Sequence, residues 1–490
     1  MDYKALKSGT DVRGFASDKG GHEVNLTNEA VYDISSAFVK WVADHTKKEV
    51  KDLVFAVGHD SRISADRISE QVIAALTASG VKVYDCGLAS TPAMFMTTID
   101  LHTDGAIQIT ASHHPFDRNG LKFFIKEGGL ESSQLSEVIE IAEKGDFIKA
   151  QGGNCEKVCY MTTYSKRLRD MICTAIGKTE EEKPLKDYHI VVDAGNGVGG
   201  FYASEVLAPL GADVEGSRFL EPDGMFPNHI PNPEDKDAMK SICDAVKVSK
   251  ADLGVIFDTD VDRAGCVDSE GNEINRNRLI ALASIIAMEG NEGATIVTDS
   301  VTSDGLKTFI EEDLGGKHYR YRRGYKNVIN KAIELCNEGI NCPLAIETSG
   351  HAALRENYFL DDGAYLMTKI IIELGRGRDL QKTLANLKCP KEEKECRLNI
   401  TEADFKAYGQ RVIEELEEFV KGDSSYRVAD DNREGIRVST DYGWFLLRLS
   451  VHDPVMPLNF ESDEVGGIDK MIAALRPFFE KYQGLNISAL

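Results

Sequence analysis

The stretch Ile109-Thr-Ala-Ser-His-His-Pro-Phe-Asp-Arg-Asn-Gly-Leu-Lys122 joins a short apolar run to a polar turn. The run, Ala106 to Ala111, predicts a buried strand that ends on Ser112. A serine at a strand end, where the backbone must turn, can present its hydroxyl to a ligand from a rigid support. Taken alone the stretch also fits an ordinary polar turn, so its interpretation depends on two further segments.

The second segment, Gly254-Val-Ile-Phe-Asp-Thr-Asp-Val-Asp-Arg263, carries three alternating aspartates. On an extended backbone Asp258, Asp260 and Asp262 would leave from one face, and their carboxylates would repel one another without a cation among them. Hard oxygen ligands suit magnesium or calcium. An EF-hand loop begins with the same spacing but needs a glycine and a glutamate where this chain has Arg263 and Ser269. The EF-hand interpretation is excluded, and a structural acidic turn remains the alternative.

The third segment, Ile346-Glu-Thr-Ser-Gly-His351, also follows an apolar strand-like run. Glu347 and Ser349 could hold sugar hydroxyls, and His351 could bind phosphate or move protons. A lone segment of this kind is more often an ordinary loop. Its significance comes from its occurrence beside the other two.

The bulk properties indicate a globular protein of several domains. The chain has 490 residues, of which 42% are hydrophobic and 28% charged. Its net charge of -23 argues against a nucleic-acid or anionic-membrane partner. No apolar run is long enough for a membrane span, and the N-terminus lacks the apolar core of a signal peptide. The cysteines form no Cys-x-x-Cys pair, so we expect reduced thiols and a cytoplasmic location.

Short β-branched runs alternate with longer amphipathic stretches, which is typical of βαβ units. The expected strands cover residues 53–57, 81–84, 106–110, 190–193, 253–257, 295–298 and 344–346, and helices are expected at 68–79 and 278–288. A strand opening into a polar loop recurs at Ser112, Asp258 and Glu347. Ligands collect at the carboxyl ends of such strands, so we expect these loops to surround one cleft. After about residue 395 the pattern changes to helix 402–420, strands 435–439 and 444–450, and helix 469–483.

In this order the segments resemble the α-D-phosphohexomutase family, which comprises phosphoglucomutases, phosphomannomutases and phosphoglucosamine mutases. The matching motifs are Ser8-Gly-Thr-Asp-Val-Arg-Gly14, Val57-Gly-His-Asp-Ser-Arg62, Thr110-Ala-Ser-His-His-Pro115, Val192-Asp-Ala-Gly-Asn-Gly197, Glu221 to Glu234, Asp258 to Arg263 and Glu347 to His351. The resemblance implies three similar α/β domains with mixed sheets covered by helices, plus a smaller C-terminal α+β domain, around one central cleft. The expected domains are 1–150 with the phosphoserine loop, 151–274 with the metal loop, 275–390 with the sugar loop, and 391–490 for phosphate binding.

The resemblance also implies the reaction, in which a hexose phosphate exchanges its phosphoryl group between the 1 and 6 hydroxyls. Phosphorylated Ser112 would donate its phosphoryl group to form a hexose 1,6-bisphosphate, which turns round and returns its other phosphate. Asp258, Asp260, Asp262 and the phosphorylated Ser112 would hold Mg²⁺. Glucose and mannose phosphates are the expected substrates, with phosphoglucosamine as the alternative. The expected partners are thus small-molecule hexose phosphates, with no nucleic acid and no membrane, and the protein would be a monomer or weak homodimer.

Individual roles follow from the same resemblance. The candidates for proton transfer or stabilisation of the reacting oxygens are Arg13, His113, Lys122 and His351, among which the general base stays open. The expected substrate-binding residues are Arg263, Glu347, Ser349, His351, Lys326, Arg448, Ser450 and His452. The stretch Arg448-Leu-Ser-Val-His-Asp-Pro454 departs from the family pattern Arg-x-Ser-Gly/Asn-Thr-x-Pro. Valine stiffens the loop, and His452 would replace a threonine hydroxyl by a cationic donor.

Two alternatives come from other classes of protein. Gly195-Asn-Gly-Val-Gly-Gly200 satisfies G-x-G-x-x-G after a strand, with Glu215 following 20 residues beyond Gly195. This is the dinucleotide-binding pattern and would indicate an NAD-linked oxidoreductase. The altered terminal loop would also fit a non-catalytic sugar-phosphate sensor on the same fold. Neither alternative gives the serine, metal and sugar loops a joint purpose as an enzyme of sugar phosphates does.

Overall fold

The computed structural model describes residues 2–450 and 453–490. Contacts divide the chain into two compact units. The first contains the described residues up to 275, together with 349–353 and 360–381. The second contains 276–348, 354–359 and the described residues from 382 onward. The domain boundaries expected near residues 150, 274 and 390 divide the chain more finely and remain predictions.

The N-terminal sheet belongs to the first unit and has the strand order β1-β2-β6-β5-β3-β4-β8, with β7 beside β6. Its strands are β1 (Lys7–Ser8), β2 (Asp11–Phe15), β3 (Val54–His59), β4 (Lys82–Leu88), β5 (Gly105–Ile109), β6 (Arg118–Ile125), β7 (Gly128–Gly129) and β8 (Asn154–Lys157). Strands β5, β3, β4 and β8 are parallel, whereas β1, β2 and β6 pair in antiparallel fashion. Because parallel strands end at one edge, the loops after β3, β4 and β5 emerge together.

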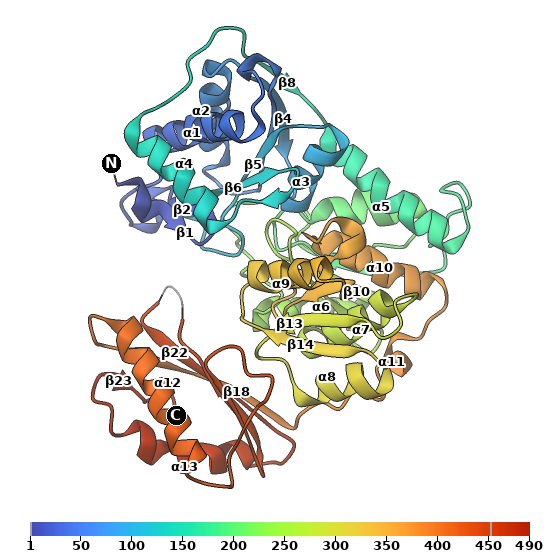
Figure 1. The fold of residues 1–490 in the computed structure, drawn as a ribbon. Coiled ribbons are helices and arrows are strands. Elements are labelled where there is room, and N and C mark those ends of the chain that lie inside the picture. The colour runs from blue at the N-terminus through green and yellow to red at the C-terminus, as the bar shows by residue number, and fades with distance from the viewer. Residues whose placement is uncertain (1, 451–452) are drawn as a thin grey trace. The chain divides into compact units, whose positions relative to one another are not determined.

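Helices cover both faces of this sheet (Figure 1). They are α1 (Asn28–Thr46), α2 (Ala65–Ala78), α3 (Thr91–Asp100) and α4 (Ser132–Lys144). Helix α1 begins where the Thr27 side chain accepts a hydrogen bond from the Ala30 amide, an N-cap that satisfies one of the first-turn donors. Its residues Val31, Ile34 and Phe38 recur at helical spacing and are fully buried with α2, α4 and the strands.

A second sheet of the first unit has the order β12-β11-β10-β9. Its strands are β9 (Ile190–Asp193), β10 (Leu253–Phe257), β11 (Ala264–Asp268) and β12 (Glu273–Ile274). The same unit contains α5 (Tyr160–Ile176), α6 (Lys236–Ser249), α10 (Gly363–Gly375) and the short strand β17 (Leu360–Asp361), which is not one of the strands of this sheet. Strand β10 is buried along its whole length, as its uninterrupted apolar sequence predicts, and pairs with β9 in parallel and β11 in antiparallel. Its carboxyl end delivers Asp258 to the interior.

The second unit begins with an α/β segment in which β13 pairs in parallel with both β14 and β15. Its elements are α7 (Arg276–Met288), β13 (Thr295–Asp299), α8 (Asp304–Thr308), β14 (Lys317–Tyr321), α9 (Tyr325–Asn337) and β15 (Leu344–Ile346). The short elements β16 (Ala352–Leu354) and α11 (Leu380–Thr383) lie farther along the chain. Again the strand ends meet, because Thr348 Oγ1 donates to Asp299 Oδ2 at 2.7 Å and the Gly324 amide donates to Glu347 Oε1 at 2.5 Å.

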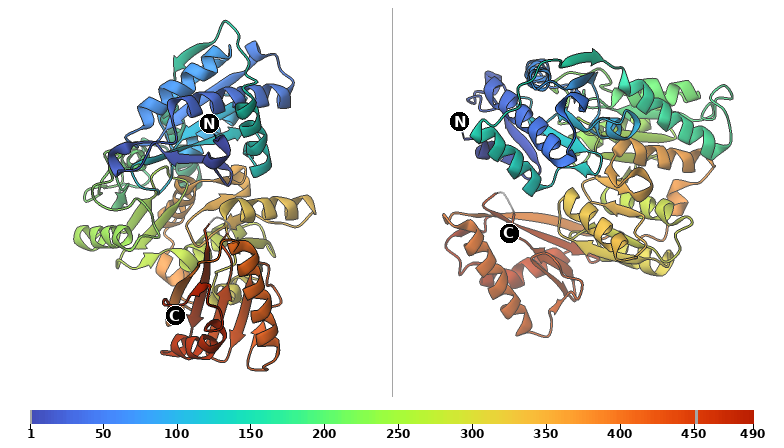
Figure 2. Two further views of the ribbon diagram at one scale, coloured as in Figure 1. Left: turned by 90° about the vertical axis from the view of Figure 1, so that its left-hand side faces the viewer. Right: turned by 45° about the horizontal axis from the view of Figure 1, so that its top comes forward.

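The C-terminal part of the second unit is an antiparallel sheet with the order β19-β20-β21-β22-β18-β23. Its elements are β18 (Glu392–Ile400), α12 (Phe405–Lys421), β19 (Arg427–Val428), β20 (Ile436–Thr440), β21 (Gly443–Leu447), β22 (Val455–Ser462), α13 (Gly467–Phe479) and β23 (Leu485–Asn486). Figure 2 shows α12 and α13 against this sheet, where they enclose a core containing Leu416, Phe445 and Leu475. On the opposite face Trp444 and Leu446 pack with Val301.

The expected fold class is confirmed: α/β layers are followed by a smaller α+β part. Several expected boundaries are wrong by a few residues; α2, for example, starts at Ala65 rather than residue 68, and β4 ends at Leu88 rather than residue 84. Helix α12 starts at Phe405 rather than residue 402, because Asp404 caps it by accepting from the Ala407 amide. Helix α13 ends at Phe479 rather than 483, and strand β21 ends at Leu447 rather than Ser450. None of the helices in the described part of the chain is long and apolar enough to cross a bilayer.

Candidate active site

Ser112 lies in the turn after β5 and has a left-handed backbone, with φ of +48°. Its amide donates to Thr110 Oγ1 at 2.9 Å, which fixes the turn. Its hydroxyl donates to Asp258 Oδ2 at 2.9 Å and lies 3.3 Å from His113 Nδ1. The side chain expected to carry the chemistry therefore touches the acidic loop of a different sheet.

Asp258, Asp260 and Asp262 are buried and converge, with one ligand atom from each within 4.8 Å of the others. The extended backbone expected for them is wrong, because residues 258–262 follow β10 as a turn. Val261 in this turn has φ of +67°, a conformation that costs a β-branched residue free energy. Hydrogen bonds hold it there, including one from the Gly363 amide to the Val261 carbonyl at 3.1 Å.

The crowded carboxylates shift one another's protonation. Burial, followed by the charges of Asp262 and Asp260, raises the pKa of Asp258 well above its usual range. Burial and Asp262 likewise raise the pKa of Asp260 to about 6. Burial alone would raise the pKa of Asp262 too, but Lys122, His351 and Arg263 outweigh it and lower that pKa below its usual range. One member of the cluster thus stays ionised while its neighbours resist ionisation.

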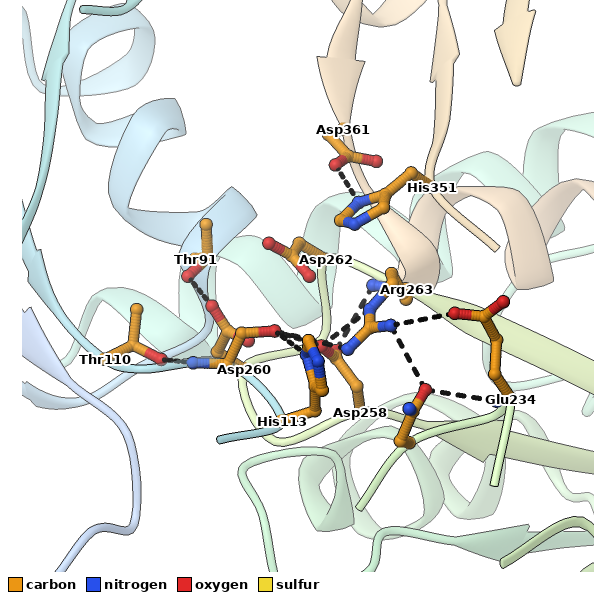
Figure 3. A network of polar contacts seen from close by, with 12 residues as sticks. Thr91, Thr110, His113, Glu234, Asp258, Asp260, Asp262, Arg263, His351 and Asp361 are labelled. Carbon is orange, nitrogen blue, oxygen red and sulfur yellow. Dashed lines mark hydrogen bonds and ion pairs between the residues drawn. The ribbon is translucent and has the colours of Figure 1, made fainter. Parts of the chain in front are cut away.

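Three cations surround the cluster (Figure 3 shows the Arg263 contacts). Arg263 donates from its backbone amide and Nε to Asp258, each at 3.2 Å, and from Nη2 to Ser112 Oγ at 3.3 Å. Lys122 Nζ lies 3.2 Å from Asp262 Oδ2 and 3.5 Å from Asp11 Oδ2. Arg13 pairs with the same Asp11 oxygen at 2.7 Å and donates to the Thr110 carbonyl. Three basic side chains are therefore paired with the buried carboxyl groups of this region, and Arg263 is the one that reaches the Ser112 hydroxyl.

Two histidines flank the cluster, and their pKa values are shifted in opposite directions. Burial, followed by the charge of Arg263, lowers the pKa of His113 to about 2, so its ring is neutral. Burial alone would also lower the pKa of His351, but Asp361 and Asp262 together raise it to about 9. The Nδ1 atom of His351 pairs with an oxygen of Asp361, as Figure 3 shows. The site thus holds a neutral ring beside Ser112 and a cationic ring beside Asp262.

The acidic cluster fits a hard divalent cation. The Oδ1 atoms of Asp260 and Asp262 are buried and make no hydrogen bond in the described part of the chain. A buried carboxylate oxygen without a donor is costly, and a bound cation would remove that cost. The other Asp260 oxygen accepts from the Thr91 hydroxyl, which orients the group. Asp262, His351 and Asp361 also lie close enough together to share a cation.

Comparisons with known proteins agree along the chain. The phosphoglucomutase/phosphomannomutase family matches through its alpha/beta/alpha domain I at residues 6–149, domain II at 162–271 and domain III at 275–388. The chain belongs to the phosphoglucomutase/phosphomannomutase family. A phosphomannomutase/phosphoglucomutase of Pseudomonas aeruginosa is 31% identical over 95% of this chain and 93% of its own. A phosphoglucomutase of Neisseria gonorrhoeae is 29% identical over 94% of each chain.

A solved structure gives the same result for the fold. The crystal structure of a phosphoglucomutase/phosphomannomutase family protein from Burkholderia thailandensis covers 98% of each chain with a TM-score of 0.80 and 25% identity. This α-D-phosphohexomutase is accordingly an enzyme of the isomerase class, an intramolecular phosphotransferase.

The remaining predicted residues of this phosphohexomutase fall in both units. Ser349 is buried in the first unit. In the second, buried Glu347 accepts from the Gly324 amide, and Lys326 stands in the first turn of α9. Arg448 Nη2 lies 3.9 Å from Glu395 Oε2, and Ser450 Oγ accepts from the Asp453 amide at 3.2 Å. Val451 and His452, expected to alter the phosphate loop, lie outside the described residues.

Asp11 and Asp361 belong to the site, although neither was predicted as a site residue. Asp11 forms ion pairs with both Arg13 and Lys122, and Asp361 forms one with His351. Asp11 lies in the N-terminal motif two residues before Arg13, so its place in that motif could have indicated it as a site residue. Asp361 lies on β17, ten residues beyond its partner, and no local pattern marks it. Only the tertiary structure shows that a carboxylate backs this histidine.

The glycine-rich segment after β9 does not support the dinucleotide-binding alternative. A Cβ atom on Gly197 would lie 2.5 Å from the Thr259 carbonyl oxygen, and one on Gly200 would lie 2.1 Å from the Leu220 carbonyl oxygen. These glycines therefore allow backbone segments to pack against each other. The first of these contacts places the segment against the acidic loop itself.

Proposed function

We propose that this phosphohexomutase interconverts hexose 1-phosphate and hexose 6-phosphate, with glucose and/or mannose as the sugar. Phosphorylated Ser112 is the phosphoryl donor and a hexose 1,6-bisphosphate is the intermediate. The observation that carries the proposal is the contact of Ser112 Oγ with Asp258 and Arg263, which places a hydroxyl between a carboxyl oxygen and a guanidinium group. Phosphoryl transfer depends mainly on such positioning and charge neutralisation.

In the first step the bond between phosphorus and Ser112 Oγ breaks while phosphorus bonds to the free hydroxyl oxygen of the hexose phosphate. The hydroxyl proton passes to a base, and Ser112 Oγ leaves phosphorus with the bonding electron pair and takes up a proton to become the free hydroxyl. The bisphosphate then turns round, and its other phosphate returns to Ser112 by the reverse chemistry. The enzyme therefore regains its phosphate, and the sugar has changed the position of its own.

The chain offers four groups for proton transfer and charge stabilisation. Neutral His113, 3.3 Å from Ser112 Oγ, resists protonation because burial and Arg263 lower its pKa, whereas protonated His351 is able to donate a proton. Arg13 and Lys122 both pair with Asp11, and Lys122 also pairs with Asp262. We assign them to stabilisation of the transferring phosphoryl group, together with Arg263.

Asp258, Asp260 and Asp262 are the residues that would hold Mg²⁺ beside phosphorylated Ser112. The cation would supply positive charge that stabilises the phosphoryl oxygens. The hydrogen-bond-free oxygens of Asp260 and Asp262 support this assignment. For the sugar, Glu347, Ser349, Lys326, Arg448, Ser450 and His452 are proposed as contacts. A cytoplasmic location and a monomer or weak homodimer belong to the same proposal.

The test is a mutase assay with Mg²⁺ and a trace of hexose 1,6-bisphosphate. It compares glucose 1-phosphate, mannose 1-phosphate and glucosamine 1-phosphate as substrates. Ser112→Ala should abolish turnover. Ser61→Ala is the matched control, because that serine also follows a parallel strand and its buried Oγ makes no hydrogen bond in the described chain.

Each outcome distinguishes a different alternative. Preference for glucosamine 1-phosphate would identify a phosphoglucosamine mutase, the principal alternative. Phosphate on Ser112 without turnover of any sugar would favour a sugar-phosphate sensor. Full turnover by Ser112→Ala would overturn the phosphoserine mechanism. A change in the absorbance of a nicotinamide cofactor on addition of the protein would be needed to support the oxidoreductase alternative.

A further inference from the structure

Arg62 is a buried arginine that does not contact the acidic cluster, and the proposed chemistry gives it no role. It follows β3 and is 2% exposed. Its guanidinium is directed at the loop that carries Ser112. Nη1 donates to the carbonyl oxygens of Pro115 at 2.6 Å and Arg118 at 2.9 Å. Nη2 donates to the carbonyl of His114 at 2.6 Å and to that of Ser112 itself.

The same arginine is tied to the other side of the loop through Asp60. Arg62 Nε lies 3.2 Å from Asp60 Oδ2, and the Arg62 amide donates to Asp60 Oδ1 at 2.9 Å. Asp60 Oδ2 in turn accepts from Thr110 Oγ1 at 2.7 Å, and Thr110 Oγ1 accepts from the Ser112 amide. Ser112 is therefore held through both its amide and its carbonyl by one connected network.

A second segment, residues 224–232, also packs against Arg62. The Phe226 ring lies 5.2 Å from the guanidinium carbon. Gly224 packs so closely that an added Cβ would lie 2.4 Å from the Ile63 nitrogen. This segment continues to Asn232, whose side chain accepts from Arg263 Nη1 at 3.1 Å. Arg62 thus contacts both the Ser112 loop and the segment that supports Arg263.

The physical need for such a residue is clear from the conformation of Ser112. A left-handed backbone is unfavourable for a non-glycine residue, so surrounding contacts must hold it. The buried carbonyls of this loop also need donors. A guanidinium offers five N–H donors in a rigid planar fork, whereas a lysine ammonium offers three donors around a point.

We propose that Arg62 is a positioning residue for phosphoryl transfer, which fixes Ser112 Oγ against Asp258 by holding the carbonyls of residues 112, 114, 115 and 118. It touches neither the serine hydroxyl nor the transferred group. The effect on catalysis rests on the proposed phosphoserine function, whereas the hold on the loop does not. Both parts are tested separately.

The experiment compares Arg62→Lys with Arg67→Lys. Arg67 is a matched control on α2, because it also binds backbone carbonyls, those of Ala16 at 2.9 Å and Leu26 at 3.2 Å, but not those of the Ser112 loop. The measurements are thermal unfolding, amide hydrogen exchange of residues 110–118, kcat and KM for glucose 1-phosphate, and the rate at which glucose 1,6-bisphosphate phosphorylates Ser112.

We expect Arg62→Lys to stay folded and to speed amide exchange in the Ser112 loop. Its kcat and phosphorylation rate should fall about a hundredfold, with KM changed by less than about threefold, as expected for misplacement of a reacting atom. Arg67→Lys should lose similar thermal stability and keep its kcat. Unchanged exchange in the loop, or equal loss of kcat in both variants, would overturn the proposal.

The result remains distinguishable from failure of the proposed function. If the unmodified protein shows no turnover and no phosphate on Ser112, the proposed function is wrong, whatever the two variants show. Hydrogen exchange in the Arg62→Lys and Arg67→Lys variants then still decides whether Arg62 holds the loop. If Arg62→Lys does not fold, Arg62→Gln, which keeps a planar donor, is measured in its place.

Discussion

Ser112 Oγ donates a hydrogen bond to Asp258 Oδ2 at 2.9 Å, although the two residues lie 146 positions apart in the chain. Each stands just beyond the carboxyl end of a strand, β5 for the serine and β10 for the aspartate. The two strands belong to different sheets of the same compact unit. The contact therefore requires both sheets to be formed, and it joins the proposed nucleophile to the acidic cluster.

Asp258→Asn should lower mutase turnover by at least about a hundredfold, because an amide NH2 group replaces one of the carboxyl oxygens that accept from Ser112 and Arg263 and orient them. The variant keeps the shape of the side chain, so we expect it to fold. Turnover of glucose 1-phosphate and thermal unfolding are measured together. The matched control is Asp252→Asn, just before β10 at its opposite end, which should keep full turnover. Equal turnover in both variants would contradict the role given to Asp258.

Local sequence predicted the strand ends of the site well, because apolar runs ending in polar residues determine both the strand and its boundary. Strands β9, β10 and β15 coincide with their predicted ranges. The turn after β10 was not predicted, since Val261 is a β-branched residue of high strand propensity that adopts φ of +67°. Tertiary contacts override the local preference there.

Supporting residues were harder to predict than the reacting ones. Arg62 and Asp361 act through partners that are distant or unmarked in the sequence, and the spacing of residues contains no information about which carbonyl or ring they contact. Arg62 reaches residues 50 to 56 positions away. Such contacts depend on the order of strands in the sheet, which places β3 beside β5.

Mg²⁺ should raise the unfolding temperature of the protein, and a chelator should lower it and abolish turnover. The reason is that a ligand bound only to the folded state stabilises that state. Asp260→Asn should remove most of the Mg²⁺-dependent shift. Without Mg²⁺ the same variant should be more stable than the unmodified protein at neutral pH, because burial and Asp262 raise the pKa of Asp260 to about 6 and make its ionisation costly.

The check is differential scanning calorimetry with and without Mg²⁺, using Ca²⁺ as a second cation. If the unmodified protein unfolds at the same temperature with and without Mg²⁺, the three aspartates are ruled out as a magnesium site. An Asp260→Asn variant that responds to Mg²⁺ as the unmodified protein does would remove that residue from the site.

Asp431→Asn should lower the free energy of unfolding by about 1–3 kcal/mol at neutral pH. Asp431 Oδ2 lies 2.9 Å from Arg320 Nη1 and 3.2 Å from Lys307 Nζ, and Arg320 is buried. Burial alone would raise the pKa of Asp431, but Arg320 and Lys307 lower it to about 2. The stabilisation is therefore present above pH 3.8 and is lost as the pH falls towards 2.

Urea unfolding of the Asp431→Asn variant measures this loss, with exposed Asp430→Asn as the adjacent control. The control should change the free energy of unfolding by less than about 0.5 kcal/mol. A loss in Asp431→Asn no larger than in the control would show that the ion pairs add nothing to stability.

Glu461→Gln should stabilise the protein at alkaline pH and leave it unchanged in mild acid. Glu461 is 6% exposed on β22, and burial raises its pKa from 4.5 to about 7. In the folded protein it therefore keeps a proton that the unfolded chain has already released, so the free energy of unfolding falls as the pH rises from about 4.5 to 7 and then levels off.

Glutamine at position 461 removes this pH dependence. The expected gain at pH 8 is up to about 3 kcal/mol. Urea unfolding across this pH range measures it, with exposed Glu464→Gln as the control. Parallel pH profiles for Glu461→Gln and the unmodified protein would show that Glu461 titrates normally in the folded state.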